Sequence, residues 1–439
     1  MTDPTGNTDA ASPVAAAPME RRGGPQPGIL NRPPEHLVFA ALAFAGERSP
    51  DVTRQTIEQL RTLLSRELRS DIDNLTADAD KSQPYPETGE LGFSDGFDRA
   101  HLTVTTGFSR NGLEALGVPV DLMPGDLVTI PWTSLGDAPR VADSGDVALQ
   151  ICADNAYVAE HVLRRVEHTL AGRLSTVYTV TGQQRYTSRA GRTSSAEARA
   201  LIGFHDGTAN LDPAHNPDDK DLVFINPNNL HYPPNPAPGT PGYGGGPSFP
   251  PDLRPVPTTE PAWVSGGTYL TVRASMIDTD TWDASPLGQQ EREVGRFKLS
   301  GSSLDLADDP ALRTAQPRFA TDQANTTVPL NSHMRKAGPR RPGTDDNQRR
   351  LFRRGYPTIA PGPAGRLERG LIFIGFARTT STQFEFITRG WLRNPDFPVA
   401  GAGVDPLLQR DTAVAGGYYL VPALENANKP WTWRLPPLG

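Results

Sequence analysis

The stretch that decides the fold runs from residue 147 to residue 181 and reads VALQICADNAYVAEHVLRRVEHTLAGRLSTVYTVT. Its first six residues predict a strand, and the β-branched residues from Leu174 onward predict another. Between them, apolar residues recur at helical spacing, and Gly172 is placed to end the helix. These apolar residues are Val158, Val162, Val166 and Leu170. The stretch therefore predicts a strand, a helix and a second strand.

A similar pattern lies upstream. The apolar run from His36 to Phe44 is short enough to be a buried strand. Asp51 is a candidate helix cap, and the apolar residues that follow it at helical spacing are Ile57, Leu60, Leu64 and Leu68. The run from Leu102 to Phe108 alternates like a half-buried strand. The combined order is strand, helix, strand, strand, helix, strand, which is the ferredoxin-like arrangement.

The second half of the chain repeats this pairing of apolar strands and amphipathic helices. Its strand candidates are residues 269–277, 371–376 and 418–421. One helix is expected from about Trp282 to Arg296, and another has a face formed by Phe384, Ile387 and Trp391. Two related halves in one chain indicate two packed α+β units.

We therefore predict an α+β fold in which two ferredoxin-like units pack sheet to sheet, the dimeric α+β barrel type. Residues 1–34 are small and polar and are expected to form a flexible arm. The N-terminal unit is assigned to residues 35–200 and the C-terminal unit to residues 263–439. Residues 201–262 form a motif-bearing connection between them. Its part from Pro213 to Pro261 holds 14 prolines and is expected to form neither helix nor ladder.

Composition excludes several classes of protein. The 439 residues include 42 glycines and 44 prolines, which is typical of a loop-rich chain, while 36% hydrophobic residues suffice for large cores. The single Cys152 rules out a disulfide framework and a thiolate metal cluster. A net charge of −7 shows no excess of positive charge of the kind that binds nucleic acid. No apolar run approaches the roughly 18 residues of a membrane span.

The start of the chain shows neither the basic segment nor the apolar segment of a secretory signal. Arg21 and Arg22 form a twin arginine, but Gly-Gly-Pro follows and no apolar region does. We expect a cytoplasmic protein; the alternative is an exported protein whose signal peptide has been removed.

Three clusters carry residues suited to chemistry. Gly203-Phe-His-Asp-Gly-Thr-Ala-Asn210 brackets Asp206 with glycines, so the segment either approaches a ligand or forms an Asx-type turn. Pro329-Leu-Asn-Ser-His-Met-Arg-Lys336 holds a lone histidine that is either a ligand or structural. Leu351-Phe-Arg-Arg-Gly-Tyr356 holds two arginines that are functional or merely solvated. Spacing alone favours the structural alternative for the first two clusters.

Taken in order, the clusters resemble the dye-decolorizing peroxidase family. Further segments match in the same order, and they are Gly295-Arg-Phe-Lys298, Leu299-Ser-Gly301, Gly370-Leu-Ile-Phe-Ile-Gly-Phe376, Gln383-Phe-Glu-Phe-Ile387, and Trp391 with Asn394-Pro-Asp-Phe-Pro398. The resemblance covers roughly residues 30 to 425. It implies two ferredoxin-like halves, with haem b (protohaem IX) and its iron bound in the C-terminal half.

The resemblance also implies roles for individual residues. His333 would be the proximal ligand of the iron, and Glu385 is our candidate for the acceptor that orients it. Asp206 would lie on the distal face with Arg353, and Arg354 is the alternative to Arg353. The remaining residues expected to contact the haem are Gly207, Thr208, Arg296 and Phe373.

The implied activity is a peroxidase reaction. Asp206 would move a proton between the two oxygens of hydrogen peroxide, and Arg353 would stabilise the leaving oxygen. A ferryl intermediate would then oxidise dyes, phenols or similar donors. Tyr356 and Trp391 are candidates for surface oxidation sites, against the alternative that both pack in the core. His205 departs from the Arg or Lys expected beside the acid.

Two other classes stay open: a haem-handling protein that carries haem or strips its iron, and a haem-free structural module. The natural reductant and the oligomeric state, including a homo-oligomer, are also open. The Pro-rich connection is a candidate cover for the haem entrance or a subunit contact.

Overall fold

The computed structural model describes residues 22–436 apart from 69–97, 185–197, 237–248, 251–252, 320–321, 323–325, 339–344 and 363–364. The N-terminal half contains the elements expected from the sequence, in the expected order. They are β2 (His36–Phe44), α1 (Pro50–Glu67), β3 (Thr103–Phe108), β4 (Val147–Ala153), α4 (Ala156–Thr169) and β5 (Leu174–Gln183). Antiparallel pairing gives the strand order β5-β2-β4-β3. This is the order of a ferredoxin-like unit.

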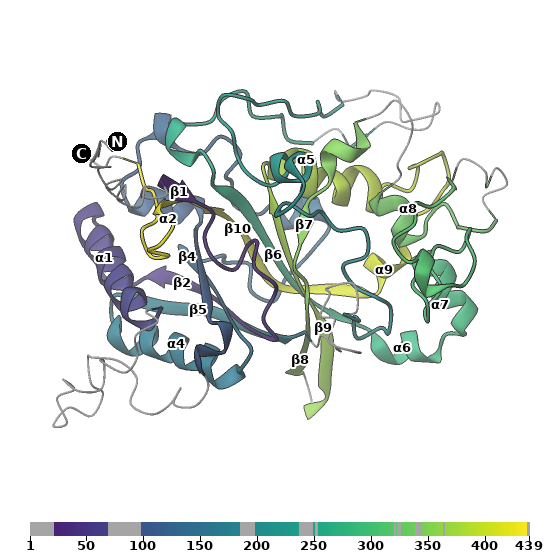
Figure 1. Cartoon of the computed structure of the whole chain (residues 1–439), viewed down its shortest axis with the longest axis horizontal. Coiled ribbons are helices and arrows are strands. Elements are labelled where there is room, and N and C mark those ends of the chain that lie inside the picture. The colour runs from purple at the N-terminus through teal and green to yellow at the C-terminus, as the bar shows by residue number, and fades with distance from the viewer. Residues whose placement is uncertain are drawn as a thin grey trace, which may run out of the picture.

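The C-terminal half repeats the arrangement with shorter helices. Its elements are β6 (Thr268–Ile277), α6 (Thr279–Ala284), α7 (Leu287–Val294), α8 (His333–Ala337), β7 (Phe352–Arg353), β8 (Tyr356–Pro361), β9 (Leu367–Ala377), a π-helical segment over 380–392, α9 (Pro406–Gln409) and β10 (Asp411–Val421). The strand order is β10-β6-β9-β7, and β8 also pairs with β9. Figure 1 shows α1 and α4 beside one half of the sheet, and α6 to α9 beside the other.

The two halves join at both edges. β10 pairs with β3, with Leu420 opposite Phe108, so the strands form one continuous sheet. At the far edge the Thr358 hydroxyl of β8 donates to the Thr181 carbonyl of β5 at 2.7 Å. The sheet therefore curves until its two ends meet. The fold class is confirmed, with the addition that the facing units are also linked edge to edge.

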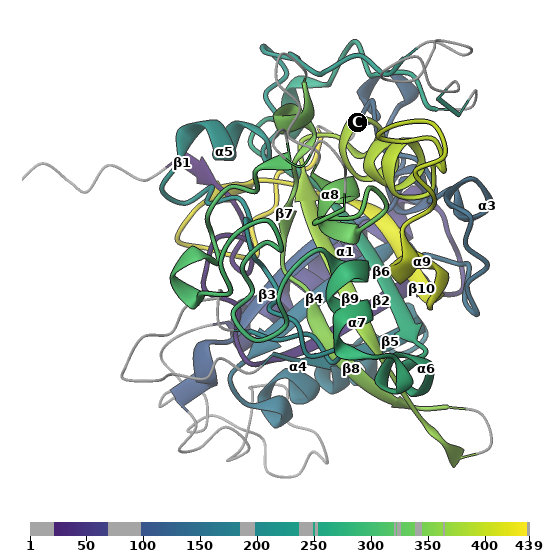
Figure 2. The same ribbon diagram turned by 90° about the vertical axis from the view of Figure 1, so that its right-hand side faces the viewer.

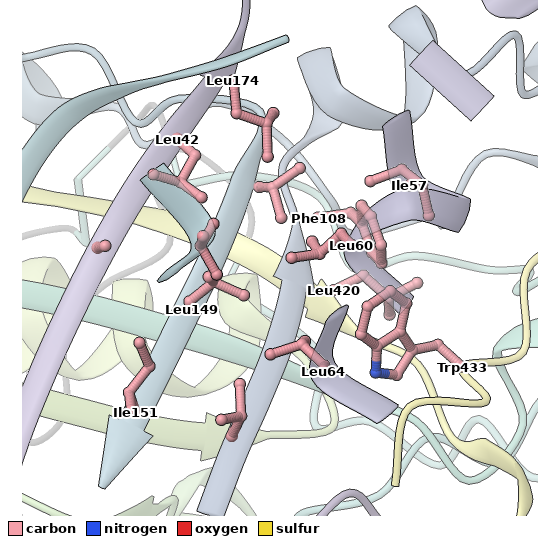
Figure 3. Packing of buried hydrophobic residues seen from close by; sticks show 14 of the residues in the cluster. Leu42, Ile57, Leu60, Leu64, Phe108, Leu149, Ile151, Leu174, Leu420 and Trp433 are labelled. Carbon is pink, nitrogen blue, oxygen red and sulfur yellow. The ribbon is translucent and has the colours of Figure 1, made fainter. Parts of the chain in front are cut away.

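Alternate residues of the strands serve two cores. One face of β2 and β4 packs against the helices of the N-terminal half, and Figure 3 shows Leu42 and Leu149 of the strands in one cluster with Leu60 and Leu64 of α1. The opposite face belongs to a core shared by both halves. This shared core includes Phe39, Tyr178, Ile374, Phe376 and Tyr419. Because successive side chains of a strand point to opposite faces, β2 and β4 each contribute to both cores.

The prediction that residues 1–34 form a flexible arm is wrong from residue 22 onward. β1 (Arg22–Gly24) pairs with β11 (Leu424–Asn426) near the other end of the chain. Gln26 is buried, and its Nε2 donates to the carbonyls of Thr106 and Pro422, both at 2.9 Å. These bonds hold the segment against β3 and the residue that follows β10, while residues 1–21 lie outside the described residues. The other domain limits stay predictions.

Two further expectations need correction. The helix expected over 282–296 is broken between α6 and α7, because Pro286 lacks an N–H and Ser285 is extended. The Pro-rich connection does contain a helical turn, α5 (Pro217–Asp221). Asn216 caps that turn by accepting the Asp218 N–H at 2.9 Å, and proline is well tolerated at the first helical position.

The remaining α-helices of the described residues are short. They are α2 (Arg110–Ala115) and α3 (Trp132–Leu135). Among the described residues, we find no helix whose length and hydropathy suit a membrane crossing.

Candidate active site

Asp206 lies on a tight loop between the two halves. Gly203, Gly207 and Ala209 adopt positive φ there, which glycine tolerates best. Asp206 Oδ1 accepts the N–H of the next residue, Gly207, at 2.7 Å, whereas the Asx-type turn expected as the structural alternative would use the N–H two residues on. Oδ2 points the other way, and a Cβ built on Gly355 would lie 3.2 Å from it. One oxygen of the carboxylate thus shapes the loop, and the other faces β7 and β8.

Arg353 comes to this loop from β7. Its Nη2 donates to the Thr208 carbonyl at 3.0 Å. Burial lowers the pKa of Arg353, and the charge of Asp206 partly offsets that effect. The guanidinium remains cationic, because its ordinary pKa is far above neutrality.

The structure separates the two neighbouring arginines. Arg354 is buried on the opposite face of the strand, and its Nη1 donates to the carbonyls of Ile29, at 3.0 Å, and Asn31. It therefore fastens the N-terminal segment under the sheet. Of the two arginines, only Arg353 reaches the loop that carries Asp206.

His333 is the first residue of α8 and faces an acid that the sequence reasoning missed. Its Nδ1 lies 2.7 Å from Asp405 Oδ2. Asp405 is fully buried, and its Oδ1 accepts the Leu407 N–H at 2.8 Å as the cap of α9. A carboxylate acceptor keeps the imidazole proton on Nδ1 and leaves the Nε2 lone pair available to a metal.

Electrostatics place these groups in one site. Desolvation lowers the pKa of His333, but the charge and hydrogen bond of Asp405 outweigh it, so the pKa is raised. Among the weaker influences, Arg353 lowers the pKa of His333 and Asp206 raises it. The three residues singled out from separate motifs therefore lie within electrostatic reach of one another.

The comparison with known families now decides the identity. The family described as "Dyp-type peroxidase, N-terminal" matches residues 26–183, and "Dyp-type peroxidase, C-terminal" matches residues 250–426. The chain belongs to the Dyp-type peroxidase family. The resemblance inferred from the motifs is confirmed, and the description of the family gives its class as peroxidase.

Solved structures and curated relatives agree with this family. A DyP-type peroxidase from Cellulomonas bogoriensis superposes with a TM-score of 0.65 at 24% identity, covering 93% of this chain and 97% of that one. DtpA from Streptomyces lividans also gives 0.65, at 22% identity, with 91% and 92% covered. Both likenesses show the fold.

The curated relatives are named deferrochelatase. The one from Yersinia pseudotuberculosis is 29% identical over 243 residues, and the one from Escherichia coli 25% identical over 287 residues. These matches cover 55% and 65% of this chain, and 47% and 56% of those proteins. The chain therefore spans about half the length of the curated relatives it matches.

The residues around His333 fit the haem of a Dyp-type peroxidase. The His333 side chain is 37% exposed although desolvation is the largest influence on its pKa, so the accessible imidazole lies among protein groups rather than on an open surface. Thr208 Oγ1 is buried and has no hydrogen-bond partner among the described residues. Within the same part of the chain, the Arg353 guanidinium donates through Nη2 alone. These unused polar groups suit a bound anionic cofactor.

Phe373 lies on the Asp206 side of β9. A Cβ built on Gly355 would touch Leu371 Cδ1 at 3.3 Å and Asp206 Oδ2 at 3.2 Å. Leu371 and Phe373 point the same way, because residues two apart in a strand share a face. The Phe373 ring packs 5.5 Å from that of Phe384.

Arg296 makes side-chain hydrogen bonds in the region that follows α7. Its Nη1 donates to the carbonyls of Gly301, at 2.7 Å, and Arg313, at 3.1 Å. Those bonds shape the loop after α7. Its role toward the haem stays a prediction.

The prediction that Glu385 orients the His333 imidazole is wrong. Both of its oxygens accept from Arg254 Nε, at 3.0 and 2.8 Å. Burial raises the pKa of Glu385, and Arg254 partly counters that effect. A buried acid that already has a cation is not available to His333, and Asp405 takes that place.

Lys336, one turn beyond His333, fixes the segment that carries Asp405. Its Nζ is buried and donates to the carbonyls of Asn394 at 2.7 Å and Gly403 at 2.5 Å. Burial lowers the pKa of Lys336 to about 8. The Lys in the Ser-His-x-Arg-Lys motif therefore ties both ends of the 394–403 loop to α8.

The prediction that Tyr356 and Trp391 are surface oxidation sites is wrong. Tyr356 is fully buried, and its hydroxyl donates to the Pro34 carbonyl at 3.1 Å. Trp391 is buried and stacks on Phe397 with ring centroids 5.4 Å apart. Both side chains serve the packing that the alternative interpretation favoured.

Proposed function

We propose that this protein is a haem-dependent peroxidase that reduces hydrogen peroxide with electrons from dyes, phenols or similar small donors. One observation carries the proposal: Asp206 and Arg353, from distant segments, meet within electrostatic reach of a His333 that is paired with a buried carboxylate. Family membership supports it.

His333 would hold the haem iron through Nε2, and Asp405 would fix its tautomer. Thr208, Gly207 and Phe373 would contact the cofactor. Haem, when bound, supplies an iron that binds peroxide and accepts the oxidising equivalents.

The protein's own part is proton transfer and charge stabilisation. The free Oδ2 of Asp206 accepts a proton from one peroxide oxygen and returns it to the other, which leaves as water. Arg353 stabilises the negative charge that develops on the leaving oxygen. Asp206 suits this role because its Oδ1 is already fixed by the Gly207 N–H, which aims the carboxylate.

Haem titration tests the proposal. Wild-type protein with added haem should show a Soret band, and His333→Ala should lose it. His215→Ala is a matched control, since His215 is exposed and paired with Asp212 at 3.0 Å. A His333→Ala variant with unchanged haem spectrum and peroxide turnover would show that the ligand assignment is wrong.

A second candidate is removal of iron from haem, favoured by the name deferrochelatase that the curated relatives carry. The two functions separate in two measurements. A peroxidase reacts rapidly with peroxide in stopped flow and leaves the porphyrin metallated. Iron removal instead gives the fluorescence of metal-free protoporphyrin together with iron captured by a chelator, without peroxide.

A further inference from the structure

Asn210, the last residue of the first motif, makes two hydrogen bonds to the backbone of Arg353. Its Oδ1 accepts the Arg353 N–H at 3.0 Å, and its Nδ2 donates to the Arg353 carbonyl at 2.7 Å. A primary amide carries one acceptor and a donor side by side, as a peptide group does. The Asn210 side chain therefore pairs with Arg353 as a neighbouring strand would.

This pairing satisfies backbone groups at the outer edge of β7. β7 ends the path of paired strands, with Arg353 opposite Gly375 of β9 on its inner side. The outer edge of such a strand presents unpaired backbone groups. In this part of the chain, Asn210 satisfies both groups of Arg353, so the edge strand is held to the Asp206 loop.

The contact links two residues of the proposed chemistry. Asp206 lies on the loop that ends at Asn210, and Arg353 also donates from Nη2 to the Thr208 carbonyl at 3.0 Å. Arg350 supports the same loop more loosely, with Nη2 donating to the carbonyls of Ala209 at 3.3 Å and Asn210 at 3.4 Å. The shortest of these bonds, at 2.7 Å, is made by Asn210, and both Asn210 bonds act on the backbone of Arg353 itself.

We propose that Asn210 is a positioning residue that sets the Arg353 guanidinium relative to the Asp206 carboxylate for reaction with peroxide. The inference rests on the proposed function. The side chain must be an amide of this length: an aspartate would lack the donor to the Arg353 carbonyl, and a glutamine would displace both bonds by a methylene group. Displacement of a catalytic group by about 1 Å costs on the order of 100-fold in rate.

The test compares Asn210→Ala with Asn235→Ala. Asn235 is a matched control, because its Nδ2 also donates to backbone carbonyls, those of Arg254 at 2.9 Å and Ser381 at 3.2 Å, outside the site. In haem-loaded protein, Asn210→Ala should lower the second-order rate with hydrogen peroxide by about 10- to 100-fold. Haem affinity and the KM for a phenolic donor should not change, and Asn235→Ala should match the wild type in the peroxide step.

Hydrogen exchange of the haem-free protein gives a readout independent of turnover. The peptide that carries the Arg353 amide should exchange faster in Asn210→Ala and stay protected in Asn235→Ala. Should Asn210→Ala fail to fold, Asn210→Asp keeps the acceptor for the Arg353 N–H and should fall between the wild type and a full loss in the peroxide step.

The outcomes are distinct. A wild-type protein that binds haem but does not react with peroxide overturns the proposed function, and this inference falls with it. An active wild type with an equally fast Asn210→Ala variant, or with unchanged exchange at Arg353, overturns the inference alone. A loss in the peroxide step that is matched by a loss in haem affinity also overturns it, because that pattern indicates a general structural role.

Discussion

At the scale of single residues, the site depends on which partner each charged group finds. His333 pairs with Asp405, Glu385 pairs with Arg254, and neither acid is exchangeable with the other in the folded chain. Asp405 carries two duties, since one oxygen caps α9 and the other orients the imidazole. Because the two oxygens of Asp405 have different roles, replacing the one that faces His333 should change the imidazole and leave the cap of α9 in place.

Asp405→Asn should weaken haem binding by about 10- to 100-fold. Asparagine still caps α9, but its NH2 group would donate to His333 Nδ1 and favour the tautomer whose proton sits on Nε2, where the iron should bind. Haem titration followed at the Soret band measures the effect. Glu385→Gln is the control and should leave the haem affinity unchanged; a larger effect from Glu385→Gln would contradict the assignment of Asp405.

Arg353→Leu and Arg354→Leu should fail in different ways. Loss of Arg353 removes the cation beside Asp206 and should slow the reaction with peroxide by about 100- to 1,000-fold, with little change in stability. Loss of Arg354 leaves the carbonyls of Ile29 and Asn31 without a donor and should lower the free energy of unfolding by about 1–3 kcal/mol. Stopped-flow rates and urea unfolding of both variants distinguish these results, and the reverse pattern would exchange the two roles.

At the scale of elements, the closing contact of the barrel is a tight one. β5 meets β8 where Gly182 lies against Tyr356, and a Cβ on Gly182 would come within 2.6 Å of the Tyr356 Cβ. The absence of a side chain at residue 182 is therefore what allows the two strands to approach. Figure 2 shows β5 and β8 near one end of the molecule from the side.

Gly182→Ala should lower the free energy of unfolding by about 1–3 kcal/mol, because the added methyl group overpacks the junction. Gly288→Ala is the matched control: Gly288 lies in α7 with open space around it, so alanine should be neutral or stabilising there. Urea unfolding of both variants gives the comparison. A Gly182→Ala variant as stable as the wild type would contradict this prediction, because it would show that the β5–β8 junction accommodates the methyl group.

At the scale of the whole molecule, a buried carboxyl group joins three parts of the chain. Glu260 of the connection accepts the Tyr269 hydroxyl of β6 at 2.6 Å and the Gly125 N–H of the N-terminal half at 2.9 Å. Burial raises the pKa of Glu260 to about 7, although both hydrogen bonds act in the opposite direction. Its charged form is therefore disfavoured in the folded protein.

This raised pKa predicts a pH dependence of stability. The folded protein binds a proton at Glu260 up to about pH 7, whereas an unfolded chain releases it near pH 4.3. The stabilising contribution is thus fully present below about pH 4 and is lost as the pH rises through about 7. Between pH 5 and 8, wild-type stability should fall by on the order of 2–3 kcal/mol more than that of Glu260→Gln. Parallel slopes of the unfolding free energy against pH in the two proteins would contradict this.

Most helices and strands follow from the amino-acid sequence, because helix and strand periodicity are local properties of the chain. The apolar runs of β2 and β4, the alternation in β3 and the apolar face of α4 identified these elements, and the order of the strands and helices identified the ferredoxin-like halves. The order of the motifs also brought Asp206, His333 and Arg353 into one hypothesis before any contact was known. Pro286 was also visible in the sequence, and a helix was nonetheless expected to cross it.

The hydrogen-bond and ion-pair partners of the site residues follow only from the tertiary structure. Glu385 and Asp405 are both acids downstream of His333, and which of them reaches the imidazole depends on how the 380–392 helix and the 394–405 loop fold back. Arg353 and Arg354 point to opposite faces of the sheet, a distinction set by the register of β7 against β9. Asn210 was quoted as part of a motif, yet its pairing with Arg353 joins segments far apart in sequence. Such contacts are fixed by long-range packing, which local patterns of residues do not encode.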